Sequence, residues 1–176
     1  LQTSDRKDGV GKLEPPQTGL VWLGVYPHAP YTGSDELSPA AGKFAAARRF
    51  PLAMHIAESE PEHDLVTGGS GDFAERWRRR GIAVAPRARS PIELLRKHGV
   101  LQRGPLLTHC VRVHAAHIQS IARHSPRVAH APAATAKPGP ATPPRVPPLP
   151  PPIRVAVASG SLPRAHRNAP RDGPHS

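Results

Sequence analysis

The sequence predicts an α/β fold built around a parallel sheet. Short apolar runs at residues 20–26, 52–57, 106–111 and 127–131 alternate with segments of helical periodicity, which is the arrangement of repeated strand–helix units. The runs are apolar at nearly every position, as in strands that are covered on both faces. With 176 residues, the chain is long enough for one domain but shorter than the about 250 residues of a typical eight-stranded α/β barrel.

The N-terminal part contains a polar segment, a strand and a helix. Residues 1–19 are polar and rich in glycine and proline, which predicts a loop or frayed end. The strand at 20–26 stops before a proline. Ser34 or Ser38 could cap the following helix, with Pro39 at its first position. Residues on one face of this helix are expected to point inward: Leu37, Ala41, Phe44, Ala45 and the stem of Arg48.

The second strand, residues 52–57, is followed by a glycine-rich loop and two helices. The loop covers 68–71, and a short, very basic helix is expected over 73–80. Ser90 has the sequence context of a helix N-cap, because Pro91 suits the first helical position and a glutamate follows at residue 93 to complete a capping box. Gly99 is placed to end that helix.

The last strand–helix unit spans residues 106–131. It consists of the strand at 106–111, a helix over 114–124 and the strand at 127–131. Three residues of the helix are expected to face the core: Ile118, Ile121 and Ala122. The three strand–helix units therefore define a predicted domain over residues 20–131.

The remaining residues, 132–176, have a different composition. They hold 13 of the 24 prolines, and the almost continuous proline run at 143–152 favours polyproline II over a packed element. Residues 153–158 briefly return to a strand-like pattern, and the rest is polar and basic, which predicts a disordered tail. The segment 145–151 fits the Arg-x-x-Pro-x-x-Pro pattern that SH3-type grooves bind, so a proline-rich interaction module is an alternative function.

Charge and cysteine content narrow the function classes. The formal net charge is +11, but from Gln119 onward there are eight Lys or Arg residues and a single acid, so much of the excess belongs to the tail. No basic helix carries interleaved aromatic residues, and we expect no nucleic-acid partner. No long apolar run predicts a membrane span. The single cysteine, Cys110, cannot form a disulfide within the chain, which fits a reducing, cytoplasmic setting.

Histidines mark the ends of three predicted strands. His28 follows the first strand, His55 lies in the second with Glu58 shortly after it, and His109 lies in the third. In a parallel barrel the carboxyl ends of successive strands meet at one mouth, so these side chains could converge. Neutral imidazoles bind zinc, which lowers the pKa of a bound water to about 7. Any one of these histidines could equally be an ordinary hydrogen-bonded residue, and Cys110 is expected to be a small core residue.

Four segments closely resemble, in order and spacing, the amidohydrolase superfamily, in particular its chlorohydrolase and cytosine-deaminase-like branch, which includes S-adenosylhomocysteine, adenosine-analogue and aminodeoxyfutalosine deaminases. The segments are Pro27-His-Ala-Pro-Tyr-Thr32, Met54-His-Ile-Ala-Glu-Ser59, Ser90-Pro-Ile-Glu-Leu-Leu95 and Leu107-Thr-His-Cys-Val111. The resemblance implies a partial (β/α)8 TIM barrel in which residues 20–131 supply strands four to six, with strands seven and eight degenerate.

The resemblance also implies a metal-dependent hydrolase that acts on carbon–nitrogen bonds by deaminating an aminopurine-like or related cyclic amidine substrate. It assigns one divalent metal, zinc first and iron second. By the same resemblance His55 is a metal ligand, Glu58 is the acid that protonates a substrate ring nitrogen, and His109 orients the attacking water. His28 corresponds to a substrate-binding histidine.

The chain departs from the family pattern at the remaining metal ligands. No histidine precedes His28, so the His-x-His pair of the family's first strand has no counterpart, and the aspartate position of strand eight falls on Gly160. The strand-seven segment is also altered, at residues 131–135. We therefore expect an incomplete family member that binds metal weakly, if at all, on its own. The alternative is a non-catalytic barrel fragment, whose open sheet edges would favour association, for example as a homo-oligomer.

Overall fold

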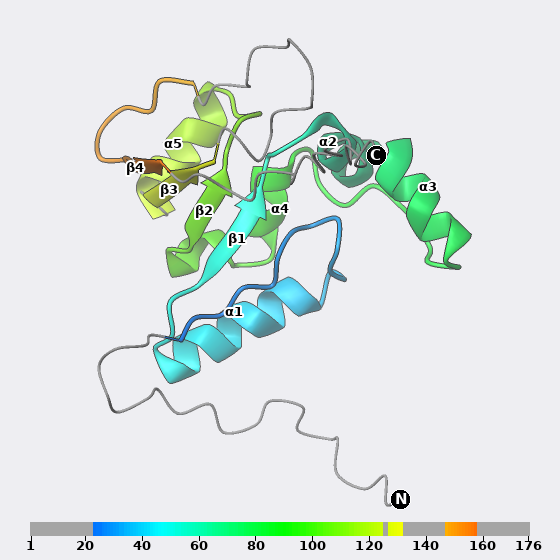
Figure 1. Ribbon diagram of the computed structural model, residues 1–176, viewed down its shortest axis with the longest axis horizontal. Coiled ribbons are helices and arrows are strands. Elements are labelled where there is room, and N and C mark those ends of the chain that lie inside the picture. The colour runs from blue at the N-terminus through cyan, green and yellow to red at the C-terminus, as the bar shows by residue number, and fades with distance from the viewer. Residues whose placement is uncertain (1–22, 125–126, 132–146, 158–176) are drawn as a thin grey trace, which may run out of the picture.

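A computed structural model of the chain describes residues 23–124, 127–131 and 147–157. It contains a sheet of four strands in the order β1-β2-β3-β4, in which every neighbouring pair is parallel. The strands are β1 (Ala53–Ile56), β2 (Leu106–His109), β3 (Arg127–His130) and β4 (Arg154–Val157). The predicted α/β fold with a parallel sheet is therefore confirmed, and three of the predicted strands lie where the apolar runs indicate (Figure 1).

The first predicted strand is shorter than expected in the described part of the chain. Val25 forms an isolated parallel bridge with Leu52, in which its N–H donates to Pro51 O at 2.8 Å and its carbonyl accepts from Ala53 N at 3.0 Å. Residues 20–22 of the predicted strand lie outside the described residues. Through this bridge, the segment that precedes His28 lies beside the start of β1.

In the described part of the chain, five α-helices connect or flank the strands. They are α1 (Leu37–Arg48), α2 (Glu60–Gly68), α3 (Gly71–Arg79), α4 (Pro91–Lys97) and α5 (Ala115–His124), and a 3-10 turn covers Leu101–Arg103. Helices α2, α3 and α4 lie between β1 and β2 in the chain, and α5 lies between β2 and β3, so each of these two crossovers contains helix. Figure 1 shows α3 projecting at the end of the molecule away from β3 and β4.

Helix α2 was not predicted, because its nine residues are mostly polar and end in the glycine-rich segment. The structure shows why it forms. Ser59 is an N-cap whose side chain accepts a hydrogen bond from Glu62 N, and Pro61 occupies the first turn. Gly69 ends the helix in the left-handed conformation with φ of 61°.

The predicted start of α1 was wrong. The N-cap is Glu36, no side chain caps the helix, and Pro39 is its third residue. The predicted inward face was right at Ala45, which is buried, and wrong at Leu37, which is 44% exposed. Ser38 and Gly42 are the other buried positions of the helix. A Cβ on Gly42 would lie 3.0 Å from the Arg103 side chain, so close packing against the 3-10 turn selects the smallest residue here.

Helix α4 begins as predicted. Ser90 accepts a hydrogen bond from Glu93 N at 3.1 Å, Pro91 is the first residue of the helix, and Gly99 follows its C-cap with φ of 67°. The main core lies between the sheet and these helices. Its large buried members are Met54, Ile56, Ile92, Leu95, Leu101, Leu107 and Ile121, and the predicted inward residues Ile118 and Ala122 pack against it.

Part of the proline-rich segment packs on this core. Ile153 is buried, Leu149 contacts the core, and β4 pairs with β3 over four residues, so strand-like residues 153–158 do contribute a strand. Residues 1–19, most of the predicted tail and the first half of the proline run lie outside the described residues. Among the described helices, none is long and apolar enough to cross a membrane.

Candidate active site

Three of the four predicted site residues meet at the carboxyl ends of β1 and β2. His55 belongs to β1, Glu58 follows that strand by two residues, and His109 ends β2. Each offers one ligand atom, and these atoms all lie within 4.8 Å of one another. The imidazole rings of His55 and His109 stack with centroids 4.7 Å apart, and His109 Nε2 lies 3.5 Å from Glu58 Oε1.

His28 lies beside this cluster without being one of the three converging groups. Its backbone carbonyl accepts from His55 N at 2.8 Å, and the two rings are 5.0 Å apart in an edge-to-face arrangement. Its Nδ1 lies 2.9 Å from the hydroxyl of Thr32. The ring therefore lines the approach to His55, which is a position suited to contacting a bound molecule.

The backbone is strained where it positions these side chains. Positive φ angles occur at His28 (67°), Ala57 (52°), His109 (77°) and Cys110 (49°). Residues with a Cβ rarely adopt such angles, which cost free energy and cluster at functional sites. Ala57 directly follows β1, and His109 is the last residue of β2. These left-handed residues turn the chain sharply at the sheet edge where the cluster lies.

Two contacts that the sequence analysis missed hold Glu58. The hydroxyl of Tyr31 donates to Glu58 Oε2 at 2.8 Å. The side chain of Glu62, which is fully buried, accepts from Ala57 N at 3.0 Å and from Glu58 N at 2.7 Å. The Tyr31 hydroxyl fixes the carboxylate of Glu58, and the Glu62 carboxylate fixes its backbone.

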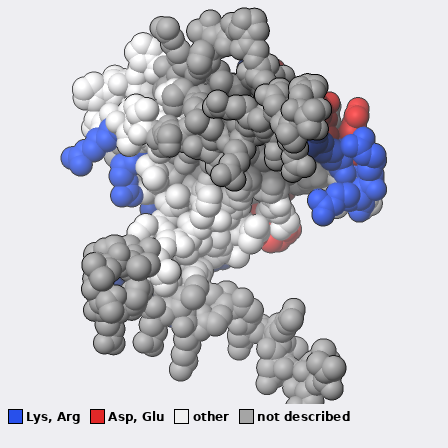
Figure 2. Space-filling view, viewed as in Figure 1, with Lys and Arg blue, Asp and Glu red and all other residues white. Residues whose placement is uncertain are grey.

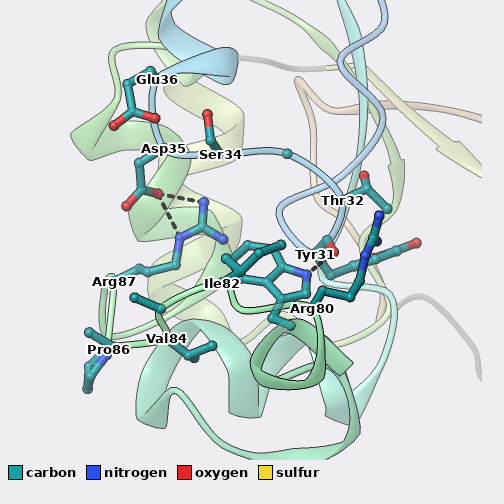
Figure 3. A pocket seen from close by; sticks show the side chains of 14 residues that line it. Tyr31, Thr32, Ser34, Asp35, Glu36, Arg80, Ile82, Val84, Pro86 and Arg87 are labelled. Atoms are coloured by element: carbon teal, nitrogen blue, oxygen red, sulfur yellow. Dashed lines mark hydrogen bonds and ion pairs between the residues drawn. The ribbon is translucent and has the colours of Figure 1, made fainter. Parts of the chain in front are cut away.

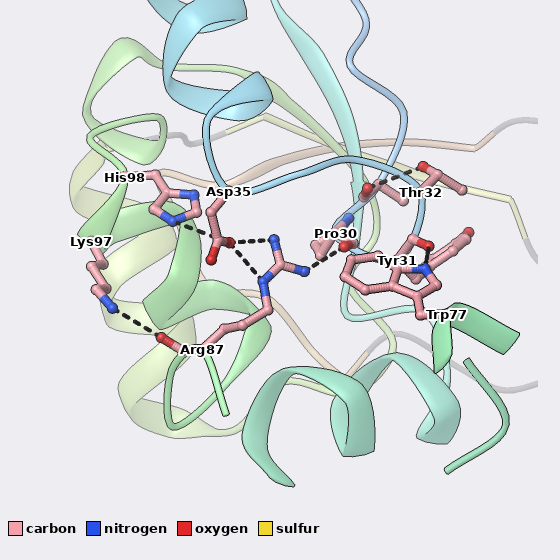
Figure 4. Close-up of polar contacts among 9 residues, drawn as sticks. Pro30, Tyr31, Thr32, Asp35, Trp77, Arg87, Lys97 and His98 are labelled. Atoms are coloured by element: carbon pink, nitrogen blue, oxygen red, sulfur yellow. Dashed lines mark hydrogen bonds and ion pairs between the residues drawn. The ribbon is translucent and has the colours of Figure 1, made fainter. Parts of the chain in front are cut away.

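Helix α3 holds Tyr31 from the other side. The indole of Trp77 donates to Tyr31 O at 3.0 Å, and the ring of Phe73 stacks on that of Tyr31 with centroids 4.5 Å apart. Figure 4 shows Trp77 directed at the Tyr31 backbone. The basic helix predicted at 73–80 thus supports the loop that carries His28 and Tyr31, as well as exposing arginines.

A cavity of about 540 Å³ adjoins Tyr31 on this side. Its walls come from residues 31–36, from Trp77 and from the loop at 80–87 (Figure 3). The guanidinium of Arg87, whose side chain is only 7% exposed, bonds Asp35 Oδ1 and the carbonyl of Pro30. His98 Nε2 lies 3.6 Å from the same carboxylate, so this network ties the two loops together (Figure 4).

Burial keeps the site histidines neutral. It lowers the pKa of His55, helped by the neighbouring charges of His109 and His28, although Glu58 opposes the shift. It also lowers the pKa of His109, again against the effect of Glu58. Within the described residues neither buried Nδ1 has a hydrogen-bond partner. Two neutral imidazoles and a carboxylate are a donor set that zinc accepts, so these residues fit a divalent metal.

Two further residues lie at the same edge. His130 ends β3, its buried Nδ1 has no partner among the described residues, and its charge contributes to the lowered pKa of His109. The thiol of Cys110 is buried, and burial raises its pKa, so it lacks the thiolate character that a nucleophile needs. This agrees with the prediction that Cys110 is a core residue.

Comparisons with known proteins show which proteins this chain is similar to. No family model matches the chain. Aminodeoxyfutalosine deaminase of Deinococcus radiodurans is 31% identical over a match that covers 57% of this chain and 26% of the relative. A 5-methylthioadenosine/S-adenosylhomocysteine deaminase of Thermococcus kodakarensis is also 31% identical, over 63% of this chain and 22% of the relative. Over this part of its length the chain is thus similar to proteins named as deaminases.

This relationship confirms the resemblance predicted from the four motifs. A solved structure of aminofutalosine deaminase from Helicobacter pylori superposes with a TM-score of 0.51 at 16% identity, over 61% of this chain and 28% of that one, which supports the fold. The chain spans about a quarter of the length of the curated relatives that it matches. The sequence matches cover 57–63% of this chain and do not establish the role of any single residue.

Proposed function

We propose that the chain carries the substrate-facing and proton-transferring part of a metal-dependent hydrolase that deaminates an aminopurine-like or related cyclic amidine substrate. The observation that supports it is the convergence of His55, Glu58 and His109 at one edge of a parallel sheet, with both buried Nδ1 atoms of the histidines unpartnered in the described structure. Perturbed, buried titratable groups that cluster in this way are typical of catalytic sites.

The fold proposal follows the same relationship. The bridge at Val25 would correspond to strand four of a (β/α)8 barrel, β1 and β2 to strands five and six, and β3 and β4 to degenerate strands seven and eight. The consecutive parallel order β1-β2-β3-β4 supports this assignment, because neighbouring barrel strands follow one another along the chain. Residues 20–131 would then form the barrel fragment, and 132–176 a proline- and arginine-rich continuation.

Each site residue has a proposed task. His55 would hold a divalent metal, zinc or iron, which when bound lowers the pKa of a water to about 7. Glu58 would deliver a proton to a ring nitrogen of the substrate, which makes the amine-bearing carbon electrophilic. His109, 3.5 Å from Glu58, would orient the attacking water. His28 would contact the substrate ring beside Tyr26, whose ring lies 6.0 Å away.

The substrate class comes from the relatives. They are named for aminodeoxyfutalosine, for 5-methylthioadenosine or S-adenosylhomocysteine, and for 5'-deoxyadenosine. An adenine-like ring has both an exocyclic amine that can leave as ammonia and a neighbouring ring nitrogen that can accept the proton from Glu58. We therefore propose an adenosine derivative as the small-molecule substrate.

Metal binding tests the site first. Cobalt(II) should bind the metal-free chain, and the bound cobalt should show the visible absorption of a low-coordinate site. Zinc should displace the cobalt. The variant H55N should weaken cobalt binding by about tenfold or more, as loss of the proposed ligand does, whereas the matched variant H63N should not. Equal binding by the wild type and both variants would remove the metal site from the proposal.

Catalysis tests the function. The zinc-loaded chain is incubated with 5'-deoxyadenosine and with S-adenosylhomocysteine, and ammonia release is measured. We expect E58Q to abolish release while binding cobalt within about twofold of the wild type, since removing a general acid costs about 10²–10⁴ in rate. Absence of ammonia from the zinc-loaded wild-type chain with every adenosine derivative would contradict catalysis by this chain.

A further inference from the structure

A second concave surface lies between α4 and α5, away from the histidine cluster. This α4–α5 groove has a volume of about 350 Å³, and its lining includes Arg89, Glu93, Arg96, His117, Ser120 and Arg123. An adjoining hollow of about 340 Å³ shares Arg89 and His117 with it and extends to residues 111–113. Since residues 111–113 follow β2, it is this adjoining hollow that extends to the edge of the sheet where β2 ends.

The groove carries an excess of cationic side chains. Three arginines face a single carboxylate, Glu93, whose Oε1 is already paired with Arg96 at 3.4 Å. Arg89 and Arg123 form no ion pair or hydrogen bond with any other residue in the described part of the chain. Arg89 and Arg123, whose guanidinium groups have ten N–H donors between them, thus line the groove without a partner in the described part of the chain.

His117 adds a further donor. The backbone N–H of His114 is directed at His117 Nδ1, 3.5 Å away, so the Nδ1 lone pair faces the start of α5. Burial and the charges of His114 and His63 lower the pKa of His117 to about 4, which leaves one proton on the neutral ring. With Nδ1 as the acceptor, that proton is on Nε2, and the ring is a hydrogen-bond donor at its other end.

The donors in the groove determine whether it favours an anion or a cation. A metal ion would need an imidazole lone pair, but that of His117 faces a backbone N–H, and the arginines repel a cation. An anion meets three arginines and a single carboxylate, which is already paired with Arg96. The cavity beside Tyr31 differs, because Asp35 neutralises Arg87 and Glu36 lies on the same wall, so it offers no comparable preference for anions.

We propose that the α4–α5 groove binds the phosphate group of a small molecule, held by Arg89, Arg123 and His117. A phosphate has three free oxygens for these three donor groups, whereas a carboxylate has two, and arginine forks match phosphate geometry. The groove volume of about 350 Å³ leaves space beyond a phosphate for the organic part of an ester. This site does not depend on the proposed deaminase activity.

Phosphate titration of the whole chain tests this site. Backbone ¹H–¹⁵N resonances of residues 114–120 are followed while inorganic phosphate or methyl phosphate is added at constant ionic strength, with chloride as the comparison anion. We expect saturable shifts with both phosphates and none with chloride. Tighter binding of methyl phosphate supports an ester ligand, and equal binding supports recognition of the phosphate group alone.

Variants localise the site. R89M and R123M should each raise the dissociation constant for phosphate by about tenfold, since a charge-assisted hydrogen bond contributes about 1.5–3 kcal/mol. The matched control is R79M on α3, where arginines gather on a convex surface at one end of the molecule (Figure 2). R79M should leave the constant within about twofold. Equal shifts with chloride and phosphate, or equal effects of all three variants, would overturn the proposal.

Discussion

Glu62 connects the site to the fold at the scale of a single residue. Its carboxylate is buried yet accepts the N–H groups of Ala57 and Glu58 with separate oxygens. Ala57 has a positive φ of 52°, so the strained turn after β1 is held by a side chain from α2. Breaking these two hydrogen bonds would free both the turn and the backbone of Glu58, which makes Glu62 a positioning residue for the cluster.

The variant E62Q tests the charge state of this residue. Burial raises the pKa of Glu62 to about 7, although its backbone hydrogen bonds oppose this. The unfolded value is about 4.3, so the stability contributed by the protonated form is fully present below it and lost as the pH rises through about 7. The wild-type minus E62Q difference in unfolding free energy should fall by at most about 3 kcal/mol between about pH 5 and pH 8.

Urea unfolding at each pH measures that difference, and the other titrating groups cancel because both proteins share them. A difference that rises with pH would contradict the raised pKa of Glu62. A difference that stays constant would show that Glu62 keeps the same charge in the folded and unfolded states over this range.

The variant Y31F tests the contact on the Glu58 side chain. It removes only the hydroxyl that donates to Glu58 Oε2, and a hydrogen bond to a partly exposed carboxylate contributes about 1 kcal/mol. Unfolding free energy should therefore fall by about that amount. Tyr26 is 48% exposed, so the matched variant Y26F should change stability by less than about 0.5 kcal/mol. Equal losses in both variants would contradict the assigned role of the Tyr31 hydroxyl.

Sequence reasoning located the cluster but not what supports it. His28, His55 and His109 could be found because strand ends of a parallel sheet meet at one edge, and this rule needs only the strands. Glu62 could not, since a charged residue in a polar helix is ordinarily exposed. Its position four residues after Glu58, with Ser59 as a cap between them, was the available signal. The Tyr31 contact spans 27 residues and has no local signal.

At the scale of elements, the N-cap of α4 offers a direct test. Ser90 is buried and accepts from Glu93 N at 3.1 Å, whereas Ser70 stands at the N-cap of α3 without a side-chain cap hydrogen bond. S90A should lower the unfolding free energy by about 1 kcal/mol. S70A should lower it by less than about 0.5 kcal/mol. Thermal or urea unfolding distinguishes them, and an S70A loss as large as that of S90A would contradict the difference in capping.

Helices were predictable where local chemistry defined their ends. The Ser90-Pro91 start and the Gly99 stop define α4 without reference to the rest of the molecule. Helix α1 lacks a side-chain cap, so its start could not be read from Ser34 or Ser38, and its buried face depends on contact with Arg103 from another element. Helix α2 has few apolar residues, and its stability comes from the buried Leu65 and Val66 and from its caps.

At the scale of the whole molecule, the four-stranded sheet has an apolar outer strand. In the described part of the chain β4 pairs only with β3, and its residues Val155 and Val157 are 47% and 79% exposed. Unpaired backbone groups beside apolar side chains favour pairing with another chain. The barrel proposal gives the same expectation. In a closed barrel the outer side of β4 would pair with another strand, so a sheet that is only part of a barrel has an edge that favours pairing.

The variant V157K should therefore reduce self-association of the chain. A lysine on an edge strand disfavours strand pairing between molecules, and the side chain of Val157 contributes little to the core because it is mostly exposed. Light scattering over a concentration series should show a lower mean mass for V157K than for the wild type. The matched variant L37K replaces an apolar residue that is 44% exposed on α1, away from the sheet edge, and should leave the mass unchanged. If the wild type is a monomer at every concentration, or if L37K lowers the mass as much as V157K does, β4 is not the surface through which the chain associates.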